Sequence, residues 1–426
     1  MKDGWLLTNV VALMSALQAV GFAQEKKPAL KEAWSAWEDG EIVRAQTLAR
    51  KALVALKESD EAHHLLILTA FVTGNYHEGL DHYRAIGARY RRLRELTEPV
   101  IDAHVHLGDI AAAAAFARAR REVPAVTVQR LEAHAARALR VDLDGVGVVP
   151  FADHPLTEYF PAFVAGINGH AITAHLDTGG AFLLMGPQRA AALGIRTANA
   201  GTGRAHLNLS RVEMSYGIAE RFVLGGAVLH NVPVEILSTL TGENDWVIFG
   251  TNVLERFLST MDYPNRRLIL SRRGDGPAGA EHLAMLPSGR VPVPFYLWSD
   301  HFMFARGGLG ERRDLNFFVD SGLVSLHPDG TGGTRQASFT SSARRFKEWG
   351  ISGADINRDV FESRDPLSLG SLREERPLFV VGAAGDTTFG GVRIDGLISH
   401  AFFKRHTWTI DFDRHEYRFA SRDDSQ

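Results

Sequence analysis

The chain of 426 residues contains no cysteine. This absence excludes disulfide bonds, cysteine-ligated zinc and a thiol nucleophile, so stability must come from packing. Basic residues are not in excess either, because 47 lysines and arginines against 50 aspartates and glutamates give a net charge of −3. Nucleic acid is therefore not an expected partner. Apart from the first residues, no apolar run is long enough to cross a membrane.

The apolar run at the N-terminus is typical of an export signal. Lys2 precedes a stretch that begins at Trp5 and ends at Val20, and the Gly-Phe-Ala of residues 21–23 offers small residues at the usual cleavage spacing. The stretch is short for a membrane span, which needs about 20 residues. We therefore expect residues 1–23 to be a cleaved signal peptide and the mature protein to be periplasmic or secreted. An uncleaved membrane anchor is the alternative.

Residues 28–140 are rich in alanine, leucine and arginine, a composition typical of helices. Gly40, Gly74 and Gly108 are spaced by 34 residues each, and a small residue follows five positions after each of them. This pattern resembles the tetratricopeptide repeat (TPR), whose period is 34 and in which a small residue lets two helices approach closely. The resemblance implies two to three degenerate repeats with a concave face for a peptide or protein partner. A plain helical bundle is the alternative.

Inside this helical region, Asp102, His104 and His106 resemble the first-strand metal motif of the amidohydrolases. That motif requires a barrel of eight strands with further ligands downstream. Here the residues lie just before Gly108, in a predicted helix, which places His104 and His106 on different faces. We therefore expect no metal site and no cofactor.

The remainder of the chain consists of short β-branched and aromatic runs separated by Gly, Asp, Asn and Pro, which predicts an all-β region. We expect two β units, at residues 146–272 and 288–420. A polar, glycine-rich linker at residues 273–287 would join them. Only residues 187–193 and 341–349 are expected to form helices.

Each β unit contains an apolar run that ends in a similar tripeptide, Asp177-Thr178-Gly179 in the first and Asp320-Ser321-Gly322 in the second. Taken singly, each tripeptide is an ordinary turn sequence. In both units, however, a buried apolar strand and a closing hairpin follow in the same order. The offset between equivalent positions is 143 residues at the tripeptides and 149 residues from the second strand onward. This repetition indicates that the units are copies, each placing one carboxylate at a strand end.

Two carboxylates in matching contexts suggest a dyad. If Asp177 and Asp320 share one site, they cannot both ionise easily, so that one proton is shared and the titration belongs to the pair. Such a pair is suited to activating a water molecule by acid–base chemistry.

This arrangement resembles the pepsin-like and retropepsin-like aspartic proteases, especially the bacterial envelope members. The resemblance implies a multidomain protein with an N-terminal all-α helical-repeat module and an all-β, two-lobed aspartic-protease fold. It implies an exported, monomeric aspartic endopeptidase that needs no cofactor or metal and acts on a peptide or protein substrate. Asp177 and Asp320 would then be the catalytic dyad.

The same resemblance assigns supporting roles to the other residues of the two tripeptides. Gly179 and Gly322 would let the backbone turn closely behind the carboxylates and would donate N–H groups to them. Thr178 and Ser321 would form hydrogen bonds across the pseudo-twofold axis and lock the two loops together.

Three residues depart from the family pattern. Gly180 and Leu323 stand where pepsins often have a hydroxyl residue, which predicts raised pKa values for the dyad and an optimum nearer neutral. Ser399 stands where the second lobe should have a buried glycine. Two other hypotheses therefore stay open: a non-catalytic peptide-binding or scaffold protein, and a protein whose first lobe dimerises through Asp177.

A flap hairpin over the substrate is expected after the first catalytic strand, and Gly201–Leu209 is the candidate because its glycines would act as hinges. A plain surface hairpin is the alternative. Tyr216 is expected to be a half-buried strand residue rather than a flap aromatic.

Overall fold

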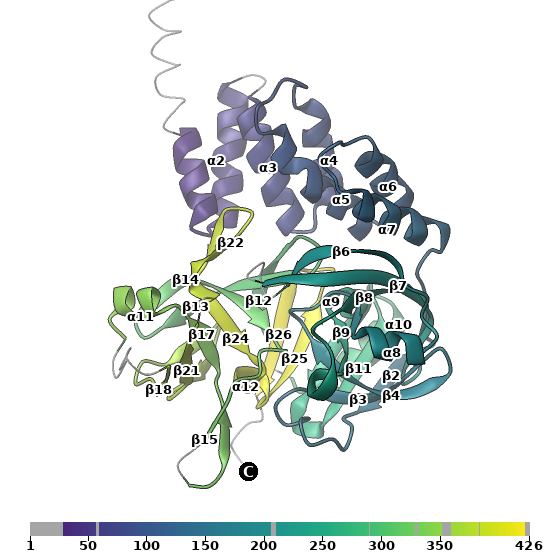
Figure 1. Ribbon diagram of the computed structural model, residues 1–426. Coiled ribbons are helices and arrows are strands. Elements are labelled where there is room, and N and C mark those ends of the chain that lie inside the picture. The colour runs from purple at the N-terminus through teal and green to yellow at the C-terminus, as the bar shows by residue number, and fades with distance from the viewer. Residues whose placement is uncertain are drawn as a thin grey trace, which may run out of the picture. The chain divides into compact units, whose positions relative to one another are not determined.

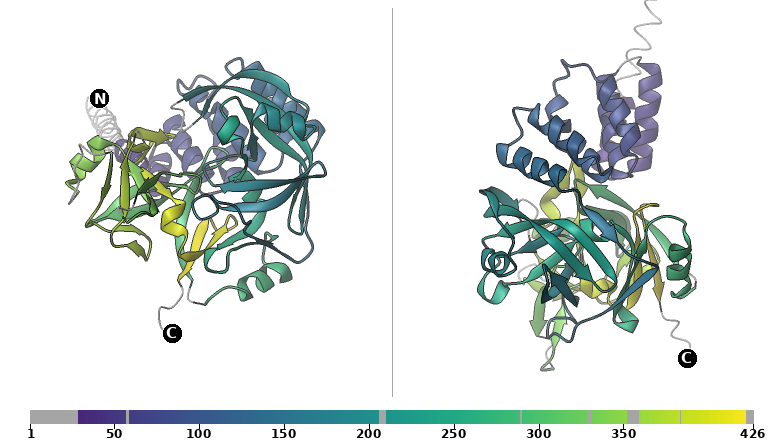
Figure 2. Two further views of the ribbon diagram at one scale, coloured as in Figure 1. Left: turned by 60° about the horizontal axis from the view of Figure 1, so that its bottom comes forward. Right: turned by 90° about the vertical axis from the view of Figure 1, so that its right-hand side faces the viewer.

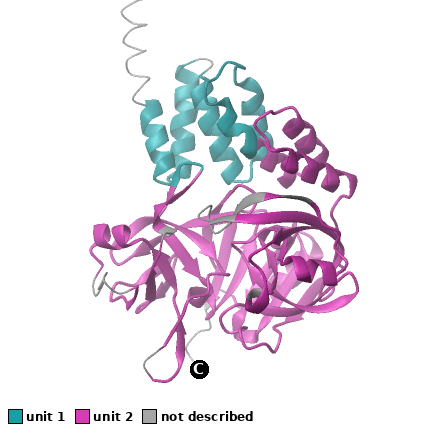
Figure 3. Cartoon of the chain, in the orientation of Figure 1, with its two compact units in different colours: residues 1–99, 390–392 teal, residues 100–389, 393–426 magenta. Residues whose placement is uncertain are grey.

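The computed structural model divides the chain into two compact units, residues 1–99 with 390–392 and residues 100–389 with 393–426 (Figure 3). The expected signal peptide lies outside the described residues. No helix in the described part of the chain is long and apolar enough to cross a membrane. The structure describes residues 29–56, 59–205, 210–288, 290–328, 331–351, 359–382 and 384–421.

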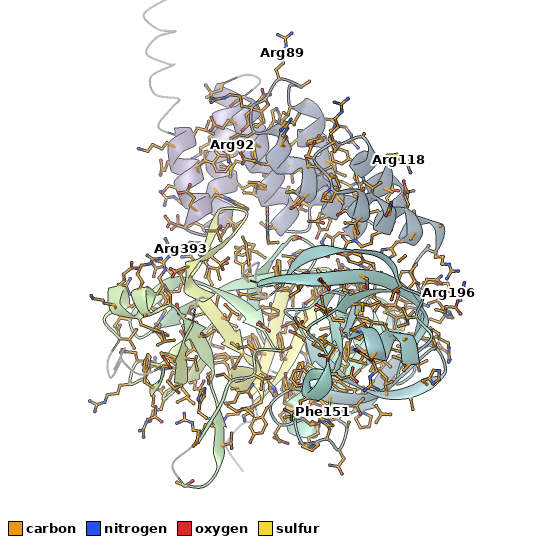
Figure 4. The ribbon with its side chains drawn as sticks, viewed as in Figure 1. Arg89, Arg92, Arg118, Phe151, Arg196 and Arg393 are labelled. Carbon is orange, nitrogen blue, oxygen red and sulfur yellow. The ribbon has the colours of Figure 1, made fainter. Side chains whose placement is uncertain are left out.

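Unit 1 is helical (Figure 1). Its central helix α3 is apolar almost all round and buries Leu65, Leu66, Ile67 and Leu68 between its neighbours. Elsewhere in unit 1, the Arg92 guanidinium lies 4.3 Å from the centroid of the Trp34 ring (Figure 4). The helices are residues 29–38, α2 (Ile42–Ala55), α3 (Asp60–Val72), α4 (Tyr76–Ala85) and the 3-10 turn η1 (Leu93–Leu96).

The 34-residue period is present in the backbone. Gly40, Gly74 and Gly108 have φ angles of 74°, 75° and 75°, a conformation that favours glycine. Each glycine ends one helix two residues before the next begins, and each donates its N–H to the carbonyl three residues earlier. At Gly79 an added Cβ would lie 2.2 Å from Phe71 Cε1, which explains the small residue five positions after the glycine. The predicted helical region is confirmed, while its assignment to the TPR family stays a prediction.

Three further helices, α5 (Thr97–His106), α6 (Ile110–Arg118) and α7 (Ala125–Ala136), precede the β region. They have a small core of their own, formed by Ile101, Ala113, Ala114, Ala117 and Leu131. From residue 100 onward these helices belong to unit 2. Unit 2 also contains the β region, except for residues 390–392 at the tip of one hairpin. We call residues 97–136 the helical segment of unit 2, although Thr97–Pro99 fall in unit 1.

Lobe 1 contains an eight-stranded sheet in the order β1-β8-β5-β9-β4-β3-β7-β6. Two short helices, α8 (Pro187–Ala192) and α9 (Thr251–Leu254), connect its strands. The strands of this part of the chain are β1 (Arg140–Asp142), β2 (Val146–Pro150), β3 (Ala162–Ile167), β4 (His170–Asp177), β5 (Leu183–Met185), β6 (Ala198–Ala205), β7 (Ser210–Leu224), β8 (Ala227–Leu237), β9 (Val247–Gly250), β10 (Phe257–Asp262) and β11 (Arg267–Arg272).

Lobe 2 is organised in the same way around β14 and β24, with helices α11 (Ala343–Trp349) and α12 (His400–Phe403). Its strands are β12 (Val291–Trp298), β13 (Phe302–Leu309), β14 (Arg312–Asp320), β15 (Leu326–Pro328), β16 (Thr334–Gln336), β17 (Phe339–Ser341), β18 (Val360–Glu362), β19 (Leu367–Leu369), β20 (Leu372–Glu374), β21 (Leu378–Val381), β22 (Thr387–Phe389), β23 (Val392–Ile394), β24 (Gly396–Ser399), β25 (His406–Asp411) and β26 (Glu416–Ser421).

The two lobes are copies, as the repeated sequence pattern predicts. In lobe 1 the strand β4 pairs in parallel with β9, which places Asp177 opposite Gly250. In lobe 2 the strand β14 pairs in parallel with β24, which places Asp320 opposite Ser399. The multidomain architecture, helices followed by a two-lobed β region, is therefore confirmed.

The closing hairpins join the lobes (Figures 1 and 2). Strand β10 of lobe 1 pairs with β25 of lobe 2, and Thr260 lies opposite Thr409, its own counterpart at the 149-residue offset. Their hydroxyl oxygens are 2.7 Å apart. A pseudo-twofold axis therefore passes between these threonines, and one buried apolar core extends through both lobes.

The stretch predicted as a linker is more ordered than its composition suggests. Residues Pro277–Ala284 form the helix α10. Its His282 is buried and bridges two strands, with Nε2 2.8 Å from Thr260 Oγ1 and Nδ1 2.9 Å from Ser271 Oγ. Desolvation lowers the pKa of His282 to about 4, so the ring is neutral and its two nitrogens are used for hydrogen bonds.

Candidate active site

The two predicted aspartates come together where the lobes meet. Asp177 ends β4, Asp320 ends β14, and their side chains share a hydrogen bond. Both residues are half-buried. Gly179 N donates to Asp177 Oδ1 at 2.7 Å, and Gly322 N donates to Asp320 Oδ1 at 3.0 Å. Each carboxylate is therefore held by the backbone of its own turn.

The glycines are required by close approach rather than by backbone conformation, because neither Gly179 nor Gly322 has a positive φ. A Cβ added to Gly322 would lie 2.2 Å from Asp177 Cγ, and one added to Gly179 would lie 2.8 Å from Asp320 Oδ1. Any other residue in place of Gly179 or Gly322 would push away the carboxyl group of the other turn.

Thr178 and Ser321 form reciprocal hydrogen bonds between the lobes. Thr178 N donates to Ser321 Oγ at 2.9 Å, and Ser321 N donates to Thr178 Oγ1 at 3.0 Å. Each hydroxyl in turn donates to a strand carbonyl of the other lobe, Thr178 to Val319 at 2.9 Å and Ser321 to Leu176 at 3.3 Å. All these groups are buried, so the network fixes the separation of the two turns.

The two turns are supported by different residues in the two lobes. In lobe 1, Thr251 N donates to Gly180 O at 3.0 Å and Thr251 Oγ1 donates to Thr178 O at 2.8 Å. A Cβ at Gly250 would lie 2.1 Å from the carbonyl oxygens of Gly180 and Ala181, so only glycine fits there.

In lobe 2 the equivalent position accommodates a side chain. Ser399 Oγ donates to Ala337 O at 2.5 Å and accepts from Ala401 N at 3.1 Å, so the hydroxyl caps α12. The turn after Asp320 is supported instead by Gln336, whose Nε2 donates to Leu323 O at 3.1 Å. Lobe 2 thus keeps the strand pairing of lobe 1 although Ser399 stands in place of the expected glycine.

The electrostatic environment of the two carboxyl groups is unequal. Desolvation and the neighbouring Asp177 hold the pKa of Asp320 well above its usual range. Desolvation also raises the pKa of Asp177, but the hydrogen bond from Gly179 and the nearby His301 oppose this rise. The two carboxyl groups therefore share one proton, and the nearby His301 favours the ionised form at Asp177.

His301 was not predicted from the sequence, because it lies in the loop between β12 and β13 and belongs to no motif. Its Nδ1 lies 2.5 Å from Asp300 Oδ1, and Asn252 Nδ2 donates to Asp300 O at 2.5 Å. Asp300 raises the pKa of His301 against the desolvation of the ring. A positive charge is therefore favoured beside Asp177.

The Asp102–His106 segment lies on helix α5 and contacts the β lobes. His106 Nδ1 lies 2.7 Å from Glu255 Oε1, and His106 Nε2 lies 2.9 Å from Ser299 O. Ser299 Oγ donates to Asp102 Oδ2 at 3.0 Å. Among the described residues no group of three or more His, Asp or Glu side chains could hold a metal ion.

The flap candidate coincides with the hairpin formed by β6 and β7, which pair in antiparallel orientation. Residues 206–209 of the candidate lie outside the described residues. Tyr216 is a half-buried residue of β7, as predicted, and the Arg130 guanidinium of α7 lies 5.0 Å from its ring centroid.

Comparison with known proteins agrees with this geometry for lobe 1. Residues 164–253, which contain Asp177 and Gly250, match the family model described as aspartyl protease. No curated protein matches the chain. Among solved structures, basic 7S globulin from soybean is similar with a TM-score of 0.41 and 9% identity, covering 65% of this chain and 94% of that chain. That likeness is too weak to support a functional argument. The chain contains an aspartic-protease-like domain.

Proposed function

We propose that the protein is an aspartic endopeptidase that hydrolyses peptide bonds with a water molecule held between Asp177 and Asp320. The single observation that carries this proposal is the meeting of two carboxyl groups at the junction of the lobes, each against the glycine of the other turn. A pair of this kind is costly to desolvate, and a duplicated fold that still brings both groups together favours a chemical role for them.

We assign the role of the base to Asp177, because His301 favours its ionised form. Asp177, as the carboxylate, takes a proton from the water while the water oxygen attacks the carbonyl carbon of the scissile bond. Asp320, as the acid, donates a hydrogen bond to the carbonyl oxygen, on which negative charge develops. The tetrahedral intermediate then breaks its C–N bond, and the leaving amine takes a proton from the dyad.

The wider setting is part of the same proposal. We propose that residues 1–23 direct export, that the protein acts as a monomer in the periplasm or outside the cell, and that the helices form TPR-like repeats that contact a protein partner. Both aspartates come from one chain, which supports the monomer over a dimer formed through Asp177.

The proposal is tested by comparing the mature protein with Asp177→Asn and Asp320→Asn on a mixed peptide library, with and without pepstatin. Asp153→Asn, at an exposed position of lobe 1, is the matched control. We expect both dyad variants to lose about 100- to 10,000-fold in rate, because that is what acid–base assistance of this kind contributes. Wild-type activity in either dyad variant contradicts the proposal. Loss in Asp177→Asn alone indicates lobe 1 dimers.

The second candidate is a non-catalytic peptide-binding or scaffold protein. The observation that favours it is the different support of the turn in lobe 2, where Gln336 Nε2 donates to Leu323 O, whereas in lobe 1 Thr251 N donates to the equivalent Gly180 O. If the wild-type protein binds peptides of the library without cleaving any, this second function replaces the first.

A further inference from the structure

A cavity of about 130 Å³ lies between the helical segment of unit 2 and the strands of lobe 1. Helices α5 and α7 form one wall, and strands β7 and β8 with the residues after the Asp177 turn form the other. Its lining is mostly apolar and includes Ile101, Val105, Leu131, Leu139, Phe182 and Val234.

The cavity adjoins the dyad. Ala181 and Phe182, which line it, directly follow the catalytic turn. Ala181 is two residues beyond Gly179, which limits the distance between their Cα atoms to about 7 Å. A further lining residue, Asp300, is hydrogen-bonded to His301, and the charge of His301 lowers the pKa of Asp177. A peptide held at the dyad would therefore have one of its side chains near the mouth of this cavity.

The charged groups of the lining are compensated by partners. The Arg130 guanidinium lies 3.3 Å from Glu235, and Arg256 Nη2 lies 2.9 Å from Glu255. Asp300 is paired with His301 at 2.5 Å, and Asp102 accepts from Ser299. A charged ligand group would have to disrupt one of these pairs, whereas an apolar group only has to displace water from apolar walls.

We propose that this cavity receives a large apolar side chain of the peptide substrate, and that helices α5 and α7 thereby determine which peptides are cleaved. The proposal rests on the proposed peptidase function and extends it to the substrate class. In this arrangement the helical segment of unit 2 forms one wall of the substrate site. This role is separate from any binding by unit 1.

Val105 offers a sharp test, because it is half-buried on α5 and lines the cavity. Val105→Trp would fill the cavity, and Val105→Ala would enlarge it. Val128→Trp is the matched control, because Val128 is a half-buried valine of α7 that packs against the same small core but lines a different groove. Each protein is profiled on the peptide library by mass spectrometry.

We expect Val105→Trp to lower cleavage of peptides with Leu, Phe or Met at one fixed position from the scissile bond by about tenfold or more relative to Ala there. Preferences at the other positions and the profile of Val128→Trp should not change. Val105→Ala should shift the preference at that position toward larger side chains. An equal fall for all peptides, or an unchanged profile in both Val105 variants, overturns the inference.

A binding experiment tests this inference independently of the proposed peptidase activity. The peptide array is probed with Asp320→Asn protein, with and without Val105→Trp, so that no cleavage is needed. An apolar preference at one position that Val105→Trp removes supports the cavity even if the wild type proves inactive. Binding without such a preference, or no binding at all, overturns the cavity assignment, whether or not the dyad cleaves peptides.

Discussion

The buried ion pair between His106 and Glu255 is predicted to fasten the helical segment of unit 2 to the β lobes. The side chains are 1% and 5% exposed, and Nδ1 lies 2.7 Å from Oε1. Glu255 raises the pKa of His106 to about 9 from 6.5 against the desolvation of the ring. His106 and Arg256 lower the pKa of Glu255 to about 2 from 4.5 in spite of its burial. The pair is therefore charged over a wide pH range.

The size of the effect follows from these shifts. Since one pKa unit corresponds to about 1.4 kcal/mol, the raised pKa of His106 contributes about 3 kcal/mol to the folded state. This contribution is fully present below pH 6.5 and is lost as the pH rises toward 9. The contribution of Glu255 is present above pH 4.5 and is lost as the pH falls toward 2. The pair thus stabilises most between about pH 4.5 and 6.5.

The measurement is urea unfolding of wild type, His106→Gln, Glu255→Gln and the double variant at pH 6 and pH 9.5. We expect His106→Gln to cost about 3 kcal/mol at pH 6 and less than about 1 kcal/mol at pH 9.5. The control is Arg118→Gln, because Arg118 and Glu132 form an exposed pair on the same helical segment (Figure 4). An exposed pair is worth less than about 1 kcal/mol. A His106→Gln cost equal to that of Arg118→Gln, or independent of pH, would refute the reasoning.

Three other predictions concern the dyad and its supports. Thr178→Val should cost about 2 kcal/mol of unfolding free energy and lower the rate, because Ser321 N is left without its acceptor; a rate loss with unchanged stability would contradict this. Gly250→Ala should leave little folded protein, since the added Cβ meets two carbonyl oxygens at 2.1 Å. A soluble and fully active Gly250→Ala protein would contradict this geometry. Because the pKa values of Asp177 and Asp320 are both raised, the rate should fall on the acid side as Asp177 becomes protonated; the profile should peak nearer neutral, and a peak below about pH 3 would sink the prediction.

The lobes and their duplication were predictable because they depend on strand periodicity and on repeated spacing. Asp177 lies opposite Gly250 and Asp320 lies opposite Ser399, so the offsets of 143 and 149 residues in the sequence correspond to pairing registers in the sheets. The left-handed turn at Gly108 was predictable for the same reason, since the 34-residue spacing repeats a local conformation.

Contacts between residues far apart in the sequence were not predictable. His106 was recognised only as part of an improbable metal motif, and its partner Glu255 is 149 residues away. His282 was assigned to a linker because the surrounding glycines and polar residues suggest a loop, yet it is buried between Thr260 and Ser271. In each case the burial of a histidine depends on packing between elements, which leaves no local pattern in the sequence.

The proposed roles of Asp177 and Asp320 differ although the two groups are chemically identical. Hydrolysis requires a base at the water and an acid at the carbonyl at the same moment, and a pair that shares one proton supplies both. Here His301 of lobe 2 favours the ionised form of Asp177, while Asp177 itself raises the pKa of Asp320. His301→Gln should therefore reduce the asymmetry and slow hydrolysis without disturbing the Thr178–Ser321 hydrogen bonds. If that variant keeps the rate and the pH profile of the wild type, the unequal roles of Asp177 and Asp320 must come from the substrate rather than from the lobes.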